Sequence, residues 1–302
     1  MHSTDASASA APLNQTPRVG HDVLKDLEVL RAIAILLTLV MHLPSLLRWW
    51  MERPPAAYSY LDFRVGVDLF FVISGYVIAI SFLGRLAAVR NADGFWRNVV
   101  GFWIRRAWRI WPSAWLWLLL IVISTKTLSA SGAFGTPEIL SHTVSDAIAS
   151  FLQVMNWRLA EGVLTNSAKI LPPNPALSIY WSLSLEEQFY LALPFIVLLT
   201  RHHLAKVLLV AVAVMFFVPK GVGSPAWFFR LDPIIWGVLM AFWRQHPSYT
   251  LLEPRFLARG KLRRVALTLA VPLLAAAVMG LNVVFFANSL VALICAALVY
   301  AG

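Results

Sequence analysis

The chain has 302 residues, of which 59% are hydrophobic and 13% are charged, and its mean hydropathy is +0.71. These values exclude an ordinary soluble domain, in which about 25% of residues are charged. The formal net charge is +10, but the basic residues lie between apolar runs, which is typical of cytoplasmic loops and not of a nucleic-acid-binding surface. The single cysteine, Cys295, argues against a disulfide framework or a cysteine-based metal site, and we expect no metal.

Residues 1–24 are expected to form a disordered cytoplasmic tail, because this small, polar segment lacks the apolar core of a signal peptide. Residues 25–302 are expected to form one all-α polytopic transmembrane domain. A membrane-spanning helix needs about 20 mainly apolar residues. Eight stretches meet this requirement, at 28–48, 65–84, 103–124, 180–200, 204–219, 227–243, 265–282 and 284–302. A weaker apolar stretch at 145–157 is expected to be interfacial or re-entrant.

The loop charges predict an orientation in the membrane. Basic residues dominate the segments 85–109 and 244–264, whereas acidic and basic residues are balanced in 125–178. Basic loops face the cytoplasm in membrane proteins, and here every second loop is basic. We therefore expect a cytoplasmic N-terminus, with outward-facing loops at 49–64, 125–178 and 220–226.

The first predicted span, VLRAIAILLTLVMHLPSLL, contains Arg31 near its start and His42 eleven residues later. In a helix this spacing covers about 16 Å and returns to nearly the same face, so the two side chains share one stripe, with His42 in the outer half of the membrane. Such polar groups are costly unless they face a partner or a wet cavity. Asp68, in the second span, is expected at the level of His42, with Ser74 deeper. Asp68 is either a structural ion pair or the carboxylate that orients the imidazole.

The third span opens FWIRRAWRIWP and brings Arg105, Arg106 and Arg109 together at the cytoplasmic boundary. One interpretation is that these residues are only cytoplasmic anchoring charges. The other is a polyphosphate site, because guanidinium groups bind phosphate in a bidentate manner. Arg105 and Arg109 share a helix face at this spacing, and Arg109 already lies inside the apolar run.

The fourth span opens WSLSLEEQFYL, and its adjacent acids Glu186 and Glu187 point to different faces about 100° apart. We expect a functional or site-organising role for at least one of them, with Ser182 and Ser184 beside them. Arg230, in the sixth span, is a natural counter-ion for Asp68 or either glutamate, and a structural pair is the favoured interpretation. The pattern predicts arginines at the inner face and the histidine, the acids and Arg230 in the outer half.

Five stretches carry a family resemblance: LRAIAILLTLVMH, GVDLFFVISGYVIA, FWIRRAWRIWP, WSLSLEEQFYL and FFRLDPIIWGVLMA. Together they resemble, in order and over most of the chain, the acyltransferase-3 family of integral membrane acyltransferases. The resemblance implies transfer of an acyl group, commonly acetyl, from cytoplasmic acyl-CoA to a hydroxyl of a surface or exported acceptor such as peptidoglycan or lipopolysaccharide. It also implies a role for each matching residue. His42 is then the catalytic histidine and Arg31 its motif partner. Arg105, Arg106 and Arg109 handle the CoA phosphates, and Glu187, Ser182 and Ser184 match the acid and serines of the family signature.

On this hypothesis His42 is the general base, and Asp68 or Glu187 orients its imidazole ring. The acyl group passes to the acceptor either directly or through an acyl-enzyme intermediate. The expected partners are the bilayer of the bacterial inner membrane, acyl-CoA and a glycan hydroxyl, with no nucleic acid; the oligomeric state is open. A proton-coupled transporter that uses His42, Asp68 and Glu187 as a relay is the rival class, although no inverted repeat supports it. A third alternative is an inactive fragment. Family members have about ten spans, so the chain is expected to be truncated or to dispense with the last helices.

Overall fold

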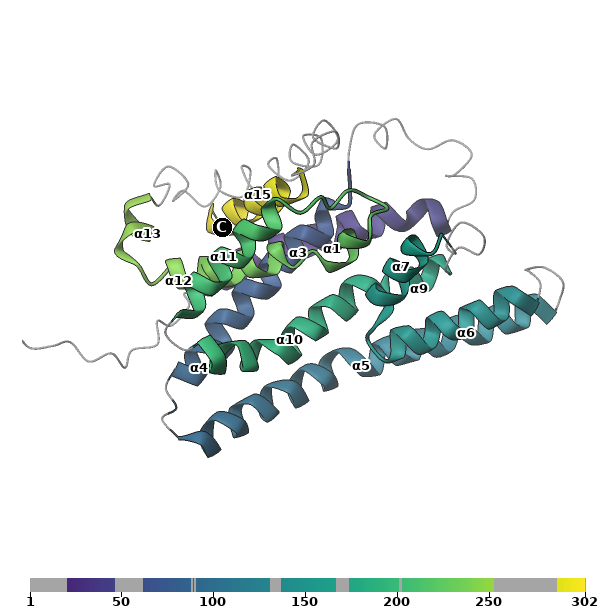
Figure 1. Cartoon of the computed structure of the whole chain (residues 1–302), viewed down its shortest axis with the longest axis horizontal. Coiled ribbons are helices and arrows are strands. Elements are labelled where there is room, and N and C mark those ends of the chain that lie inside the picture. Colours follow the sequence, from purple (N-terminus) through teal and green to yellow (C-terminus); the bar gives the residue numbers. More distant parts are fainter. Residues whose placement is uncertain are drawn as a thin grey trace, which may run out of the picture.

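The computed structural model of the chain describes residues 21–46, 62–87, 89, 91–130, 137–166, 174–200, 203–252 and 287–301. Every regular element in these ranges is a helix (Figure 1), which confirms the all-α expectation. The expected tail lies outside the described residues except for its last four, which belong to the first helix. The predicted span 265–282 also lies outside them.

A central helix, α3 (Val65–Ile78), organises the bundle. It continues through a π-helical turn, η2 (Ala79–Leu83), into α4 (Gly84–Ala87), and it packs against α1 (His21–Leu46), α12 (Asp232–Trp243) and α15 (Ala287–Ala301). A helix that is apolar on all sides is expected to be buried on all sides. Accordingly, most of the α3 side chains are buried.

Glycines set how closely the helices around α3 approach. A Cβ atom on Gly75 would lie 2.0 Å from the carbonyl oxygen of Ile234, and one on Gly237 would lie 2.0 Å from that of Val72. Small residues of this kind let membrane helices pack backbone to backbone. Gly66 plays the same part toward α1, since its Cβ would lie 2.6 Å from the carbonyl oxygen of Ala34.

The remaining helices surround this bundle. The longest, α5, runs along one edge with α6 beside it (Figure 1), and α10 contacts α5, α6, α7 and α11. Their bounds are α5 Ala92–Ala130, α6 Pro137–Phe151, α7 Met155–Leu164, α9 Pro175–Ser178, α10 Tyr180–Thr200, α11 Leu204–Phe216, η4 Pro225–Phe229 and α13 Pro247–Leu252.

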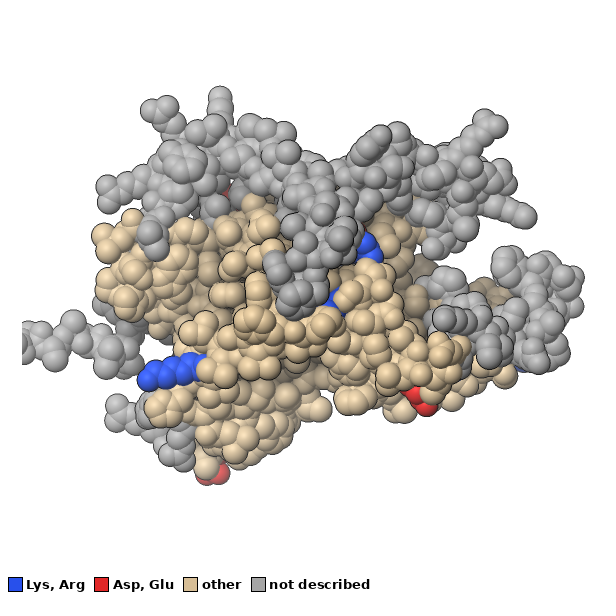
Figure 2. Space-filling model, turned by 45° about the horizontal axis from the view of Figure 1, so that its top comes forward, with Lys and Arg blue, Asp and Glu red and all other residues tan. Residues whose placement is uncertain are grey.

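Four helical segments of the described residues are long and apolar enough to cross a membrane: Val65–Leu86, Ala92–Thr127, Ala176–Thr200 and Pro225–Trp243. They match four of the eight predicted spans. The predictions at 204–219 and 284–302 correspond to shorter apolar helices, Leu204–Phe216 and Ala287–Tyr300, and 28–48 falls on α1. Large apolar side chains such as Trp108, 76% exposed, point outward, and very few charged atoms appear among the described residues on the face in Figure 2. This is the composition of an integral membrane protein.

The weaker apolar stretch at 145–157 does not form one continuous helix. In the structure α6 ends at Phe151, a turn follows, and α7 begins at Met155. Gln153 in this turn has a positive φ of 57°, a backbone conformation that is uncommon outside glycine. The stretch is therefore the corner between two helices, and it packs onto α10.

Candidate functional site

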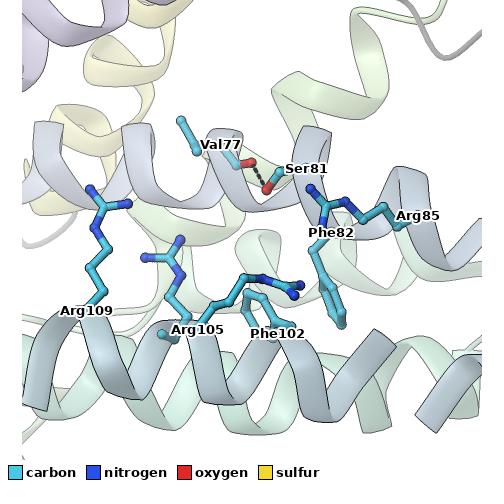
Figure 3. A pocket seen from close by; sticks show the side chains of 8 residues that line it. Val77, Ser81, Phe82, Arg85, Phe102, Arg105 and Arg109 are labelled. Carbon is cyan, nitrogen blue, oxygen red and sulfur yellow. Dashed lines mark hydrogen bonds between the residues drawn. The ribbon is translucent and has the colours of Figure 1, made fainter. Parts of the chain in front are cut away.

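A cationic cavity lies between the end of α3 and the middle of α5. We call it the arginine pocket; its volume is about 300 Å³ and it is lined by Val77, Ser81, Phe82, Arg85, Phe102, Arg105, Arg106 and Arg109. Three arginines come from α5 and Arg85 comes from α4 on the opposite wall (Figure 3). None of the described residues that line the cavity is acidic. The structure thus brings together the three predicted arginines and adds a fourth.

The π-helical turn η2 shapes one wall of the arginine pocket. Within it, the Ser81 hydroxyl donates a hydrogen bond of 2.6 Å to the carbonyl oxygen of Val77 (Figure 3). Phe82 of the same turn stacks on Phe102, with ring centroids 4.1 Å apart and ring planes 18° apart. Isolated π-turns inside α-helices are frequent at functional sites. Here the turn supplies an apolar floor beneath the guanidinium groups.

A buried carboxylate, Glu186, adjoins the arginine pocket. The Tyr190 hydroxyl donates to its carboxylate, and the Ser74 hydroxyl also interacts with it. The Arg106 guanidinium lies 4.5 Å from the centroid of the Tyr190 ring, and the Trp103 indole donates to the Tyr190 carbonyl at 3.1 Å. Burial of a carboxylate requires such partners. These contacts therefore explain why Glu186 is tolerated at 4% exposure.

Tyr190 was missed as a site residue from the sequence. The signal was present, because Glu186 and Tyr190 are four residues apart in EEQFY and thus share one helix face. Its aromatic ring made it look like an ordinary core residue. In the structure the ring does belong to the core, at 1% exposure, while its hydroxyl and face contact the two charged groups.

Both glutamates lie nearer the arginines than expected. Glu186 is six residues into α10, which is about 9 Å along the axis, and it interacts with Ser74 near the middle of α3. Glu187 is half-buried and interacts electrostatically with Arg106. Arg31 interacts electrostatically with Arg106, Arg109 and Glu186. The two glutamates are therefore grouped with the arginines, and not apart from them as the sequence predicted.

His42 lies on the same continuous helix as Arg31, as expected, and is half-buried. Among the described residues, no side chain forms a hydrogen bond or an ion pair with its ring. Gly66 of α3 packs against Ala34 and Thr38 of α1, so His42 lies one turn beyond this contact. Asp68 lies on the opposite side of this contact from His42. The axial separation between His42 and Asp68 is on the order of 10 Å, and the two are not level.

Asp68 belongs to a second polar group, which we call the buried charge network: Asp68, Lys220, Arg230, Asp232 and Ser289. Arg230 Nε lies 3.5 Å from Asp68 Oδ1, and Lys220 Nζ lies 3.2 Å from Asp232 Oδ2. Lys220 also donates to the Ser289 hydroxyl at 2.9 Å, and that hydroxyl donates to Asp232 at 3.1 Å. The structure favours the ion-pair interpretation of Asp68. Of the three acids proposed as counter-ion of Arg230, Asp68 is the one that pairs with its guanidinium group.

Two aromatic rings lie against the Arg230 end of this network. The Arg230 guanidinium lies 3.6 Å from the centroid of the Trp227 ring and 5.2 Å from that of Trp181. Arg230 is 1% exposed and Asp68 is 3% exposed. A cation over an indole face gains electrostatic attraction when it is desolvated. The two indole rings thus help to stabilise the buried positive charge of Arg230, which a purely hydrocarbon environment would not stabilise.

The two predicted serines make structural bonds. Ser184 accepts a hydrogen bond from the Met155 backbone N–H at 3.3 Å, and Ser182 donates to the carbonyl oxygen of Ile179 at 3.2 Å. Gln188 exchanges two amide hydrogen bonds with Asn156, at 3.1 and 2.9 Å. One face of α10 therefore fastens α7, while Glu186 and Glu187 on its other faces reach the site.

We expect Arg230→Leu to destabilise the protein by about 3–5 kcal/mol, because it leaves the buried Asp68 carboxylate without its counter-ion. Thermal unfolding in detergent measures the loss. The matched control is the double variant Asp68→Leu with Arg230→Leu, in which no charge is left unpaired, and it should recover most of the stability. Equal loss in the single and double variants would show that packing, not charge pairing, is what Arg230 supplies.

The fold and the site define a helical membrane protein with an arginine-lined, cationic pocket next to a buried glutamate. No group of three or more histidine, cysteine or acidic side chains in the described ranges is placed to hold a metal ion. The sequence matches the acyltransferase domain family over residues 24–301. The chain therefore belongs to the acyltransferase-3 family.

Two relatives illustrate the similarity. The peptidoglycan O-acetyltransferase OatA of Listeria monocytogenes is 30% identical over 182 residues, which are 60% of this chain and 25% of that protein. The O-acetyltransferase OatA of Staphylococcus aureus is 31% identical over 180 residues, 59% of this chain and 25% of that protein. The match thus spans about a quarter of the length of these relatives. No solved structure matches the chain.

Proposed function

We propose that the chain is a membrane-bound O-acyltransferase that moves an acetyl group from cytoplasmic acetyl-CoA to a hydroxyl of a cell-wall glycan such as peptidoglycan. The observation that carries this proposal is the arginine pocket, in which the described lining places four guanidinium groups around one cavity and includes no carboxylate. Arginine binds phosphate groups through paired, charge-assisted hydrogen bonds. The names of the two relatives support the acetyl group, and that of the Listeria protein supports a peptidoglycan acceptor.

The proposed orientation follows from the loop charges. The segment 85–109 joins two helices of the pocket and carries six arginines against one acid, Asp93. Such an excess is typical of the cytoplasmic side of the membrane. The pocket would then open toward the compartment that holds acyl-CoA, in the inner membrane of a bacterium. His42, eleven residues beyond Arg31 on the same helix, would lie toward the side from which the glycan enters.

The proposed reaction uses both ends of this arrangement. The donor phosphates bind at the arginine pocket, and the pantetheine arm extends along the face of α1 that carries Arg31 and His42. The His42 imidazole removes the proton of the acceptor hydroxyl, whose oxygen attacks the thioester carbonyl. The carbon–sulfur bond breaks, and the departing thiolate takes the proton from the imidazolium. The acetyl ester and free CoA are the products.

The acids take different parts in this proposal. Glu186 holds Tyr190, which in turn supports Arg106, so it acts as a positioning residue for the donor site. The Glu187 carboxylate interacts electrostatically with Glu186 and, more weakly, with Arg106. This proximity supports a role near the donor, whereas nothing in the described residues ties Glu187 to the His42 ring. Asp68 is occupied by Arg230 and stabilises the scaffold on which α1 packs.

Binding of acetyl-CoA to the purified protein in detergent or nanodiscs tests the proposal. We expect Arg106→Gln to weaken binding by about 10- to 100-fold, the range that corresponds to about 1.5–3 kcal/mol for a hydrogen bond to a charged group. Arg97→Gln is the matched control, since Arg97 is an exposed arginine of α5 outside the pocket. Unchanged affinity in Arg106→Gln would contradict the proposal. A separate measurement on protein in vesicles addresses the rival class: movement of substrate across the membrane without acyl turnover would instead support a proton-coupled transporter.

A further inference from the structure

Arg85 is the one pocket arginine that does not come from α5. It extends from α4, directly after the π-helical turn, and reaches the cavity from the wall that faces Arg105 and Arg109 (Figure 3). It is exposed at the mouth of the cavity, and none of the described carboxylates forms a salt bridge with it. A charged group held in this position has room for a ligand on one side and apolar rings on the other.

The charge of the pocket indicates how many phosphate charges it can take. Four guanidinium groups give a formal charge of +4, because arginine is protonated at any physiological pH. A pyrophosphate diester carries two negative charges, and a terminal phosphate monoester adds about 1.5–2 more. The nucleotide part of CoA, with a pyrophosphate and a ribose 3′-phosphate, thus nearly neutralises the pocket. A phosphopantetheine arm with a single phosphodiester would leave most of the guanidinium charge unmatched.

The layout of the pocket separates the two kinds of phosphate. Arg105, Arg106 and Arg109 lie within one turn and a half of α5, and neighbouring groups on one helix suit the two linked phosphates of a pyrophosphate. Arg85 stands apart from them on the opposite wall. The stacked rings of Phe82 and Phe102, which are 2% and 6% exposed, lie between the two walls. Their edges border the space left for the ribose and base that link the pyrophosphate to the 3′-phosphate.

We propose that Arg85 binds the ribose 3′-phosphate of the donor and makes the pocket selective for free CoA thioesters over donors that carry pantetheine on a single phosphate. This inference rests on the proposed function. It adds a residue on a second element and a reason for the π-helical turn, which fixes the direction in which α4 presents Arg85. The proposal also distinguishes Arg85 from the other pocket arginines, because the contribution of Arg85 to donor binding depends on the 3′-phosphate alone.

The experiment compares the binding of CoA and of dephospho-CoA, which lacks only the 3′-phosphate, by calorimetry on the purified full chain. The wild-type protein should bind CoA at least about 10-fold more tightly than dephospho-CoA, as expected for a lost charge-assisted pair. Arg85→Gln should weaken CoA binding by a similar factor and leave dephospho-CoA binding unchanged within about twofold. Arg97→Gln, at an exposed site outside the pocket, should change neither value. Thermal unfolding verifies that each variant is folded.

The outcomes separate the two proposals. Equal weakening of both ligands in Arg85→Gln, or no weakening of either, would overturn the assignment of Arg85 to the 3′-phosphate while leaving the donor site in place. Failure of the wild-type protein to bind CoA at all would instead overturn the proposed function. Arg85→Lys provides a further discrimination, because it keeps the charge but not the bidentate geometry; CoA affinity between that of the wild type and Arg85→Gln is expected, and affinity below that of Arg85→Gln would contradict the inference.

Discussion

Replacement of His42 with alanine is expected to lower the rate of acyl transfer by about 10²- to 10⁴-fold, the usual contribution of a positioned general base. Binding of acetyl-CoA should change by less than about threefold, because His42 does not line the arginine pocket, whose residues Arg106 and Arg109 interact with Arg31 at the other end of this face of α1. The measurement is transfer of a labelled acetyl group to a glycan acceptor, with donor binding determined on the same preparation.

His203→Ala is the matched control, since His203 is an exposed histidine that precedes α11 and does not line the pocket. Its activity should equal that of the wild type. A His42→Ala protein that inserts normally, binds acetyl-CoA and still acylates at the wild-type rate would remove His42 from the mechanism. Loss of donor binding along with transfer would mean that His42 supports the structure of α1 and is not the base.

Gly75→Leu is expected to prevent correct assembly of the bundle. Even the first atom of a side chain at this position would lie 2.0 Å from the backbone oxygen of Ile234, and a backbone carbonyl inside a helix has no alternative rotamer. The helices α3 and α12 would have to separate, and overpacking of this kind costs about 1–3 kcal/mol or more even for small additions. We expect Gly75→Ala to show a clear loss of thermal stability in detergent and Gly75→Leu to yield no folded protein.

Gly84→Ala is the control for this substitution. Outside its own helical turn, no atom of the described residues lies within 4 Å of a Cβ at Gly84, and its backbone is helical, with φ −59° and ψ −38°. Alanine is favoured over glycine in a helix by up to about 1 kcal/mol, so this variant should be as stable as the wild type or slightly more stable. A stable Gly75→Leu protein would show that the close crossing of α3 and α12 does not hold the bundle together.

Much of the secondary structure could be predicted from the sequence, because a membrane imposes a simple requirement on length and hydropathy. The helices at 65–84, 103–124, 180–200 and 227–243 follow from it directly. The corner at 145–157 could not be predicted in the same way, since a short apolar run does not show whether the chain continues straight or turns. The turn depends on contacts with α10, among them the bond from Met155 to Ser184.

The partners of the charged residues were harder to predict than their presence. Arg230 had three candidate acids, and only the packing of α12 on α3 places Asp68 within 3.5 Å of it. Lys220 could not be assigned from the sequence at all. Its loop carries it into the bundle, where it contacts Asp232 and Ser289. Position along one span does not show which residues of a neighbouring helix a side chain meets, so the proximity of both glutamates to Arg106 was not predicted.

The sequence by itself determined the class of the protein, the family, and the local groupings that helical periodicity controls: Arg31 with His42 on one face, and the three arginines of α5 in one cluster. These depend on spacing within a single helix, which is fixed by 3.6 residues per turn. The tertiary structure decided which helices meet. It joined Arg85 to the arginines of α5, placed Glu186 and Tyr190 against Arg106, and assigned Asp68 to Arg230. Contacts between helices depend on crossing points such as Gly75 and Gly237, where the absence of a side chain sets the approach, and no period along one helix encodes the register of its neighbour.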